Sequence, residues 1–231
     1  MKSDFSKLEK YFDASDEKLI RSTDEGVDEM HLSHYENRLG KYLKDPNVKK
    51  ILDLGCGEGK ILKKFASRYP DKEFIGVDLS TSNINLAKEK FQIENVKYFV
   101  ADVSASVKSL GEFDLIYSFS LIQYFDTQVS LDLANNISTI LRAKGALVHM
   151  SIPDDVHCFR ALTPEKLNLL IILKIFLKML LTFNNSKHRK YGTNGFWWSK
   201  SLMIDIHKSK YRKTKCQSSD SWYRFDFIAE K

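Results

Sequence analysis

The sequence predicts one α/β domain built on a doubly wound, mostly parallel sheet, and two observations carry this prediction. Apolar, strand-like runs alternate with helical segments between residues 48 and 153. The first run, ILDL, also leads directly into three glycines at alternate positions, Gly55, Gly57 and Gly59. Repeated β-α units favour parallel strands with helices on both faces. A chain of 231 residues is long enough for one such domain, and we see no linker that would divide it.

The core elements follow one another in a regular order after the glycines. Apolar runs predict four more strands, at Glu73–Asp78, Val96–Asp102, Phe113–Ser120 and Gly145–Pro153. Helical spacing marks TSNINLAKEKF and VSLDLANNISTILRA, and we expect Gly145 to end the second of these helices. The nearly continuous apolar strands fit a sheet that is buried on both sides. Residues 48–153 are therefore the predicted core, with a Rossmann-like arrangement.

The two ends of the chain complete the prediction of seven strands. Residues 1–47 form an expected N-terminal helical cap, in which MHLSHYENRLGKYLK places Leu32, Tyr35, Leu39 and Tyr42 on one face. Residues 201–231 are expected to hold the last helix and the last strands. There YRKTKCQ precedes the alternating run SWYRFDFIAEK, so the two can pair as an antiparallel edge hairpin.

Residues 154–200 form an expected helical insertion before the sixth strand, which we interpret as a substrate lid. Within it, Thr163–Phe183 is long enough as a helix to cross a bilayer, yet Lys174 and Lys178 lie near its middle. The basic run KHRK follows at residues 187–190. Three interpretations stay open: a lid over the substrate, a peripheral membrane contact through residues 164–190, and a dimer contact. The oligomeric state is left open as well.

Charge and cysteine content limit the partners and the compartment. The net charge of +6 is uneven, because residues 156–231 hold 15 Lys and Arg against 5 Asp and Glu. This polarity indicates an anionic partner, although a solvated basic surface would look the same. Three dispersed cysteines without metal spacing, and an N-terminus without an apolar signal region, favour the cytoplasm, with contact at the inner face of the membrane as the alternative. We expect no metal site.

The glycine turn has the composition of a nucleotide cradle. Glycine lets the backbone turn sharply and approach a ligand closely, and a helix N-terminus follows at once. A dinucleotide fold requires a third glycine three residues after the second, where this chain has Lys60. The acid Asp53 within the first strand also argues against nicotinamide binding.

With DLGCGEG at residues 53–59, the chain resembles the class I S-adenosylmethionine-dependent methyltransferases. The likeness extends over residues 48–153, through GVDLS after the second strand, ADV after the third, FDLIYSFSLIQYF, and LRAKGALVHMSIP. It implies S-adenosyl-L-methionine as cofactor and S-adenosyl-L-homocysteine as product. It also implies that Asp78 accepts the ribose hydroxyls, that Asp102 and the backbone of Val103 contact the adenine, and that Asp53 meets the ammonium group. The complete implied set of cofactor residues is Asp53, Gly55, Cys56, Gly57, Gly59, Asp78, Leu79, Asp102, Val103 and Ser118.

Structural roles are alternatives for each of these residues. The glycines could form a plain tight turn, and Asp78 and Asp102 could cap the segments that follow them. Asp53, at the end of a buried strand, needs a partner in any case.

The acceptor side carries weaker signals. Tyr124 and His157 are the candidate catalytic residues, because Tyr124 follows the fourth strand and His157 the fifth, although His157 could equally be an ordinary surface or packing histidine. Gln123, Tyr191, Phe196, Trp197 and Trp198 are the candidate pocket residues, with core packing as the alternative for the aromatic cluster. The segment GTNGFWWSK resembles the loop and helix start that close the pocket of small-molecule methyltransferases. The N-terminal residues Tyr11, His31, His34 and Arg38 are further candidates near the cofactor.

Three functions are compared. The first is methyl transfer to a small, anionic acceptor, such as a phosphorylated, sugar-linked or lipid-linked molecule, with oxygen preferred over nitrogen. The second is nucleic-acid methylation, which the pI near 9.0 favours but which the segment SFSLIQYF disfavours, because it lacks the proline-containing motifs of base methylation. The third is a cofactor-binding, membrane-associated protein without catalytic activity.

Overall fold

The computed structural model describes residues 25–157, 189–191, 195–221 and 223–231, and all elements named here lie within these ranges. The helices are α2 (Glu25–Leu43), α3 (Lys60–Arg68), α4 (Thr81–Lys90), α5 (Thr127–Ile140) and α8 (Lys200–His207), with short 3-10 turns η1 (Val107–Leu110), η2 (Ile122–Tyr124) and η3 (Asp155–His157). The strands are β1 (Lys50–Leu54), β2 (Glu73–Asp78), β3 (Val96–Val100), β4 (Phe113–Phe119), β5 (Leu141–Pro153), β6 (Arg189–Tyr191), β7 (Gly195–Trp197), β8 (Lys213–Ser218) and β9 (Arg224–Glu230).

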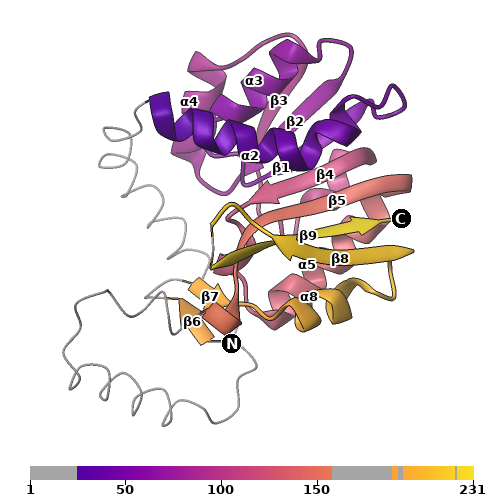
Figure 1. The fold of residues 1–231 in the computed structure, drawn as a ribbon. Coiled ribbons are helices and arrows are strands. Elements are labelled where there is room, and N and C mark those ends of the chain that lie inside the picture. Colours follow the sequence, from indigo (N-terminus) through magenta and orange to yellow (C-terminus); the bar gives the residue numbers. More distant parts are fainter. Residues whose placement is uncertain (1–24, 158–188, 192–194, 222) are drawn as a thin grey trace, which may run out of the picture.

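Seven strands form one sheet in the order β3-β2-β1-β4-β5-β9-β8 (Figure 1). Strands β1 to β5 are parallel, and β9 is antiparallel to both β5 and β8. The order reverses between β1 and β4, which is the switch point where doubly wound sheets bind ligands. The predicted Rossmann-like sheet with its C-terminal antiparallel hairpin is confirmed.

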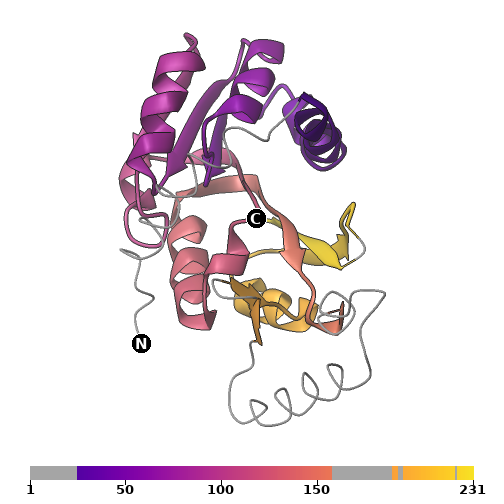
Figure 2. The ribbon, with the colours of Figure 1, turned by 90° about the vertical axis from the view of Figure 1, so that its left-hand side faces the viewer.

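Each face of the sheet carries its own hydrophobic core. Helices α2, α3 and α4 supply one core, through buried side chains such as Leu39, Phe65 and Ile84. Helices α5 and α8 and the turn η1 supply the other, through side chains such as Leu133 and Met203. Figures 1 and 2 show α2 with α3 and α4 apart from α5 and α8. The buried strands predicted from continuous apolar runs therefore have helices on both sides.

Local capping explains where three of the helices begin. Ser80, Asp126 and Ser199 precede α4, α5 and α8, and each side chain accepts a hydrogen bond from the backbone N–H three residues later. Helix α3 differs, because its N-terminal neighbour is Gly59 in a left-handed conformation that makes no side-chain cap. The last residue of the glycine turn, Gly59, is thus also the residue at which α3 begins.

Two local predictions were wrong. Gly145 does not end a helix, since α5 stops at Ile140 and β5 begins at Leu141. Its real constraint is space, because a Cβ on Gly145 would lie 2.8 Å from the carbonyl oxygen of Arg142. In the segment GTNGFWWSK the predicted helix start is present, since α8 begins at Lys200, but Gly195–Trp197 pairs with Arg189–Tyr191 as a separate two-stranded sheet. The third strand is also shorter than predicted and ends at Val100.

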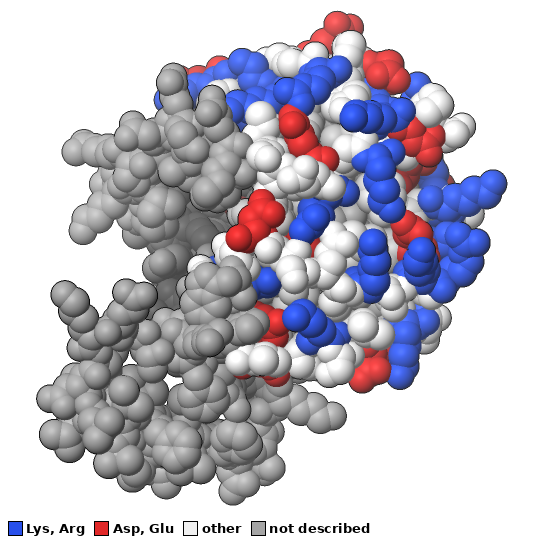
Figure 3. All heavy atoms as spheres, viewed as in Figure 1, with Lys and Arg blue, Asp and Glu red and all other residues white. Residues whose placement is uncertain are grey.

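Several predicted features lie outside the described residues. These are the first 24 residues with Tyr11, and the apolar segment Thr163–Phe183 together with its lid, membrane and dimer interpretations. Among the helices that the structure describes, none combines the length and hydropathy needed to span a bilayer. On the face shown in Figure 3, Lys and Arg side chains alternate with Asp and Glu over the described surface.

Candidate functional site

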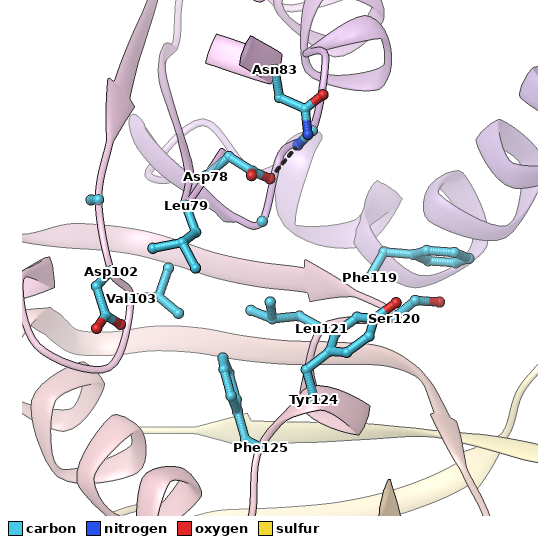
Figure 4. Close-up of a pocket in the computed structure, with 13 residues that line it drawn as sticks. Asp78, Leu79, Asn83, Asp102, Val103, Phe119, Ser120, Leu121, Tyr124 and Phe125 are labelled. Atoms are coloured by element: carbon cyan, nitrogen blue, oxygen red, sulfur yellow. Dashed lines mark hydrogen bonds between the residues drawn. The ribbon is translucent and has the colours of Figure 1, made fainter. Parts of the chain in front are cut away.

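A pocket of about 230 Å³ opens at the carboxyl ends of β1, β2 and β4, close to the end of β3 (Figure 4). This is the edge of the sheet where the strand order reverses, and where ligands bind in open α/β sheets. The pocket brings together segments that follow four different strands. The lining residues are Gly55, Gly57, Asp78, Leu79, Asn83, Ala101, Asp102, Val103, Phe119, Ser120, Leu121, Tyr124 and Phe125.

The glycine turn forms one wall of the pocket. Gly55, Gly57 and Gly59 all have φ between 54° and 78°, a conformation that side chains disfavour. A Cβ on Gly57 would meet no atom within 4 Å, so this backbone faces open space. A Cβ on Gly59 would lie 2.7 Å from the Tyr98 ring, so Gly59 is required for packing behind the pocket rather than within it.

Asp78 connects the glycine turn to the second strand. Its Oδ2 accepts a hydrogen bond from the Gly57 N–H at 2.9 Å, and its Oδ1 accepts one from the Ser80 N–H at 2.9 Å (Figure 4). Burial raises the pKa of the Asp78 carboxyl, and these N–H groups oppose the rise without cancelling it. Ser80 rather than Asp78 caps α4. Asp78 therefore orders the turn and also faces the pocket.

Asp102 also lines the pocket, next to Val103. Its Oδ1 accepts hydrogen bonds from the Ser104 N–H at 2.8 Å and from the Ser104 hydroxyl at 2.7 Å. The alternative named for Asp102, capping the helical segment that follows, is not what the structure shows, because Ser106 is the N-cap residue of η1 and Asp102 instead orders its own turn. Because Asp102 also lines the pocket, the two roles are compatible.

Asp53 is buried beneath the glycine turn and is not among the residues that line the pocket. The Tyr117 hydroxyl donates a hydrogen bond to Asp53 Oδ2 at 3.0 Å. Burial raises the pKa of Asp53 to about 8; the Tyr117 bond lowers it, and the nearby Asp78 raises it further. Cys56 and Gly59 likewise lie outside the lining set, although both belong to the turn.

The end of β4 forms the opposite wall, but not through the predicted Ser118. Ser118 is fully buried, and its hydroxyl lies 2.8 Å from His149 Nδ1. The next three residues, Phe119, Ser120 and Leu121, line the pocket instead. Ser120 has φ of 52°, an uncommon conformation for serine, at the point where the strand turns away.

Gln123 and Tyr124 both lie in the turn η2, but their side chains have different surroundings. Tyr124 lines the pocket, whereas Gln123 is buried and accepts a hydrogen bond from Arg224 Nη1 at 3.2 Å. Of the two predicted catalytic residues, the structure therefore places Tyr124 at the pocket. The backbone of His157 lies in η3, and its side chain is outside the described set.

The aromatic cluster before α8 packs into the core. Trp197 and Trp198 are almost fully buried, and the Trp198 Nε1–H donates to the Ile122 carbonyl at 3.1 Å. Phe196 is partly buried against the same core. Tyr191 pairs with Gly195 in the small hairpin, and its side chain is outside the described set. None of these residues lines the described pocket, although Trp198 supports the turn that carries Tyr124.

Six lining residues were not predicted individually. Apolar residues such as Leu121 and Phe125 read as core in the sequence, and Asn83 reads as one polar position of a helix. No spacing marks them, because they meet only through the fold. The missed residues are Asn83, Ala101, Phe119, Ser120, Leu121 and Phe125. Among the described residues, no group of three or more potential metal ligands is found.

A family model described as a methyltransferase domain matches residues 51–145, which include the glycine turn, Asp78 and Asp102. The predicted likeness to the class I S-adenosylmethionine-dependent methyltransferases is therefore confirmed over residues 51–145. The cofactor predicted from the motifs is thus the cofactor of the family, S-adenosyl-L-methionine.

Curated relatives match part of the chain. "Uncharacterized protein RP028" of Rickettsia prowazekii is 31% identical over 99 residues, which is 42% of this chain and 40% of that protein. Malonyl-[acyl-carrier protein] O-methyltransferase of Acetivibrio thermocellus is 27% identical over 93 residues, which is 40% of this chain and 31% of the relative. The chain therefore matches well under half of the length of these relatives.

Solved structures share the whole fold. The magnesium protoporphyrin IX methyltransferase of Synechocystis PCC 6803, solved with bound SAH, matches with a TM-score of 0.67 and 14% identity over 98% of both chains. PH0226 protein from Pyrococcus horikoshii matches with a TM-score of 0.62 and 20% identity over 90% of this chain and 92% of that one. At these identities the likeness concerns the fold.

Proposed function

We propose that this methyltransferase transfers a methyl group to an oxygen atom of a small, anionic acceptor. The observation that carries the proposal is the pocket described above, which is lined by the glycine turn, Asp78 and Asp102 and also by Phe119, Ser120 and Tyr124. The first group suits a nucleoside cofactor, and the second lines the space that we assign to the acceptor. A sulfonium methyl is already activated, so proximity and alignment are the main demands on the protein.

The residues at the pocket fit the cofactor in chemical type. Asp78 offers carboxylate oxygens for two ribose hydroxyls, and Asp102 with the Val103 backbone offers acceptors and donors for an adenine edge. The open backbone at Gly57 allows a ligand to approach closely, and Gly55 and Leu79 complete that wall. Asp53 lies beneath this wall, where a ligand ammonium group would favour its ionised form.

The preference for an oxygen of an anionic acceptor has two supports. An acceptor that arrives as an anion has already lost the proton that a general base would otherwise remove. Curated relatives of this chain include several malonyl-[acyl-carrier protein] O-methyltransferases, whose name describes transfer to oxygen. In this proposal Tyr124 positions the acceptor at the pocket. Gln123 and Trp198 would support the turn that carries Tyr124, through the bonds to Arg224 and to the Ile122 carbonyl. We further propose that the 154–200 insertion, which includes His157, Tyr191, Phe196 and Trp197, completes the acceptor side.

Calorimetric binding of S-adenosylhomocysteine tests the cofactor site. We expect Asp78→Ala to weaken the affinity at least tenfold, about 1.4 kcal/mol. Because Asp78 also orders the glycine turn, Asp102→Ala provides a second variant whose described bonds stay within its own turn. The matched control is Asp71→Ala, an exposed carboxylate paired with Lys49 away from the pocket. Unchanged affinity in both pocket variants would remove these carboxylates from the site.

The acceptor is identified by transfer of a labelled methyl group to a fractionated metabolite extract, followed by mass analysis of the product. The expected product is an ester or ether of an anionic compound. Labelling confined to cationic amines, or to nucleic acid, would contradict the proposal.

A further inference from the structure

A buried carboxylate outside the lining of the pocket connects two elements that lie behind it. Asp226, in the middle of β9, has no exposed surface. A buried carboxylate needs close partners to remain charged, and Asp226 has them on two different elements. These partners lie on α2 and on β5.

Helix α2 is attached to Asp226 by two cationic groups. Arg38 Nε donates to Asp226 Oδ2 at 2.5 Å, and Arg38 Nη2 donates to the Ser218 carbonyl at 2.6 Å. His34 Nε2 lies 3.3 Å from the same Asp226 oxygen, and its Nδ1 lies 2.5 Å from Asp220 Oδ2. Arg38, which the sequence analysis named as a candidate near the cofactor, is thus engaged by the C-terminal hairpin.

The same turn of α2 reaches the pocket wall. Tyr35 stacks on Phe119 with ring centroids 5.1 Å apart, and His34 meets the Phe119 ring edge to face at 5.8 Å. Phe119 lines the pocket. The docking of α2 therefore determines what lies behind Phe119.

On the other side, Asp226 is linked to the turn that carries Tyr124. Its Oδ1 accepts a hydrogen bond from the Ser151 N–H at 2.8 Å, at a position where β5 has a φ of 60°. The Ser151 carbonyl accepts a hydrogen bond from Arg224 Nη1 at 2.6 Å, and Arg224 Nη1 also donates to Gln123 at 3.2 Å. Gln123 precedes Tyr124 in η2.

We propose that Asp226 is a positioning residue for methyl transfer, which fixes Phe119 through α2 and Tyr124 through Ser151, Arg224 and Gln123. The inference rests on the proposal that this pocket binds the cofactor. Asp226 does not touch the pocket itself. Its charge acts by fixing the positions of α2 and of the end of β5 relative to the end of β4.

The arrangement depends on the charges of both partners. Burial raises the pKa of Asp226, but the nearby His34 and the hydrogen bonds from Arg38 and Ser151 outweigh it and hold the pKa below its usual value. Burial lowers the pKa of His34, but Asp226 and Asp220 outweigh it and raise the pKa above its usual value. The charged groups that face His34 among the described residues are Asp220, Asp226 and Arg38. A raised histidine pKa means that its contribution to docking is present at low pH and is lost as pH rises through that pKa.

The test uses the full chain, with S-adenosylhomocysteine as the probe and amide hydrogen exchange of residues 25–43 as the measure of docking. Asp226→Asn keeps the shape and removes the charge. We expect faster exchange in α2 and a rise of about tenfold in Kd, with Asp205→Asn, an exposed carboxylate of α8, as the unchanged control. The ratio of the Kd of His34→Gln to that of the wild type should fall as pH rises through the pKa of His34, because only the wild type loses a charged histidine there and the titration of Asp53 is common to both proteins.

Several results would overturn the inference. An Asp226→Asn variant that binds within twofold of the wild type would do so, and so would weaker binding without faster exchange in α2, or a pH profile unaffected by His34→Gln. If Asp226→Asn does not fold, Arg38→Lys is judged by the same criteria, because it keeps the charge but loses the guanidinium geometry. A wild type that fails to bind the probe would overturn the cofactor site and this inference together, whereas normal wild-type binding with an unaffected variant overturns this inference alone.

Discussion

Replacing Asp53 by Asn should stabilise the protein in the absence of cofactor, and the gain should grow with pH. Asp53 is an ionisable group that the fold prefers to keep neutral, since burial raises its pKa from 3.8 to about 8. An acid whose pKa is raised by folding makes the native state less stable as pH rises between these two values. Asn has nearly the same shape, does not ionise, and can still accept the hydrogen bond from Tyr117.

The size of the effect follows from the two pKa values. At pH 7 the unfolded carboxyl is ionised, about three pH units above its pKa, whereas the folded carboxyl is mostly protonated. Each unit corresponds to about 1.4 kcal/mol, so the penalty removed by Asp53→Asn is about 4 kcal/mol at pH 7 and about 1 kcal/mol at pH 4.5. The figure at pH 7 changes little if the folded pKa is one unit higher or lower, because the group stays largely neutral there.

Urea denaturation of both proteins at a series of pH values between 4.5 and 8 measures the difference in the free energy of unfolding. Asp71→Asn, at an exposed carboxylate, is the control and should show no comparable increase with pH. A difference between Asp53→Asn and the wild type that stays constant from pH 4.5 to 8 would refute the reasoning. Weaker binding of S-adenosylhomocysteine by the stabilised variant would show that Asp53 is kept for the ligand at a cost in stability.

Three further substitutions separate packing from binding. Gly59→Ala should lower the free energy of unfolding by roughly 1–3 kcal/mol, because its φ is positive and the new Cβ would press on Tyr98. Gly57→Ala should cost only about 1 kcal/mol in the free energy of unfolding but should weaken S-adenosylhomocysteine binding more than Gly59→Ala does. The expectation is contradicted if urea denaturation shows Gly57→Ala to be the less stable variant and calorimetry shows Gly59→Ala to be the weaker binder. Trp198→Phe should cost about 1–3 kcal/mol in urea denaturation, because it removes the buried indole N–H that donates to the Ile122 carbonyl and leaves that carbonyl with its bond from the Phe125 N–H; an unchanged midpoint would show that the indole bond contributes little.

The sequence was sufficient for the parallel half of the fold because the relevant signals there are local. Each strand from β1 to β5 is an apolar run, and the glycines follow β1 within one residue. The local signal was misleading at Gly145, because a glycine after a helical segment is typical of a helix end but is also required where a strand packs too tightly for a side chain. It also missed the hairpin β6–β7, whose strands have three residues each and no alternation long enough to detect.

The cofactor side of the pocket was predictable for a geometric reason. Parallel strands bring their carboxyl ends to one edge, so residues that directly follow β1, β2 and β3 must meet there. Gly57, Asp78 and Asp102 all follow this rule. Asp226 and Arg38 do not, because 188 positions separate them and only the antiparallel return of β9 beside β5 brings them together.

The acceptor side could not be separated from the core by composition, since both are built from the same residue types. Leu121 and Phe125 line the pocket, while Trp197 and Trp198 fill the core, and all four are large apolar side chains in the segments next to the predicted site. What distinguishes them is whether other atoms occupy the space in front of the side chain, and this depends on β4, η2 and the hairpin together. If the proposed acceptor side is right, tertiary placement determines the choice of acceptor, and Phe119 and Tyr124 are the positions at which substitutions should change acceptor choice without abolishing cofactor binding.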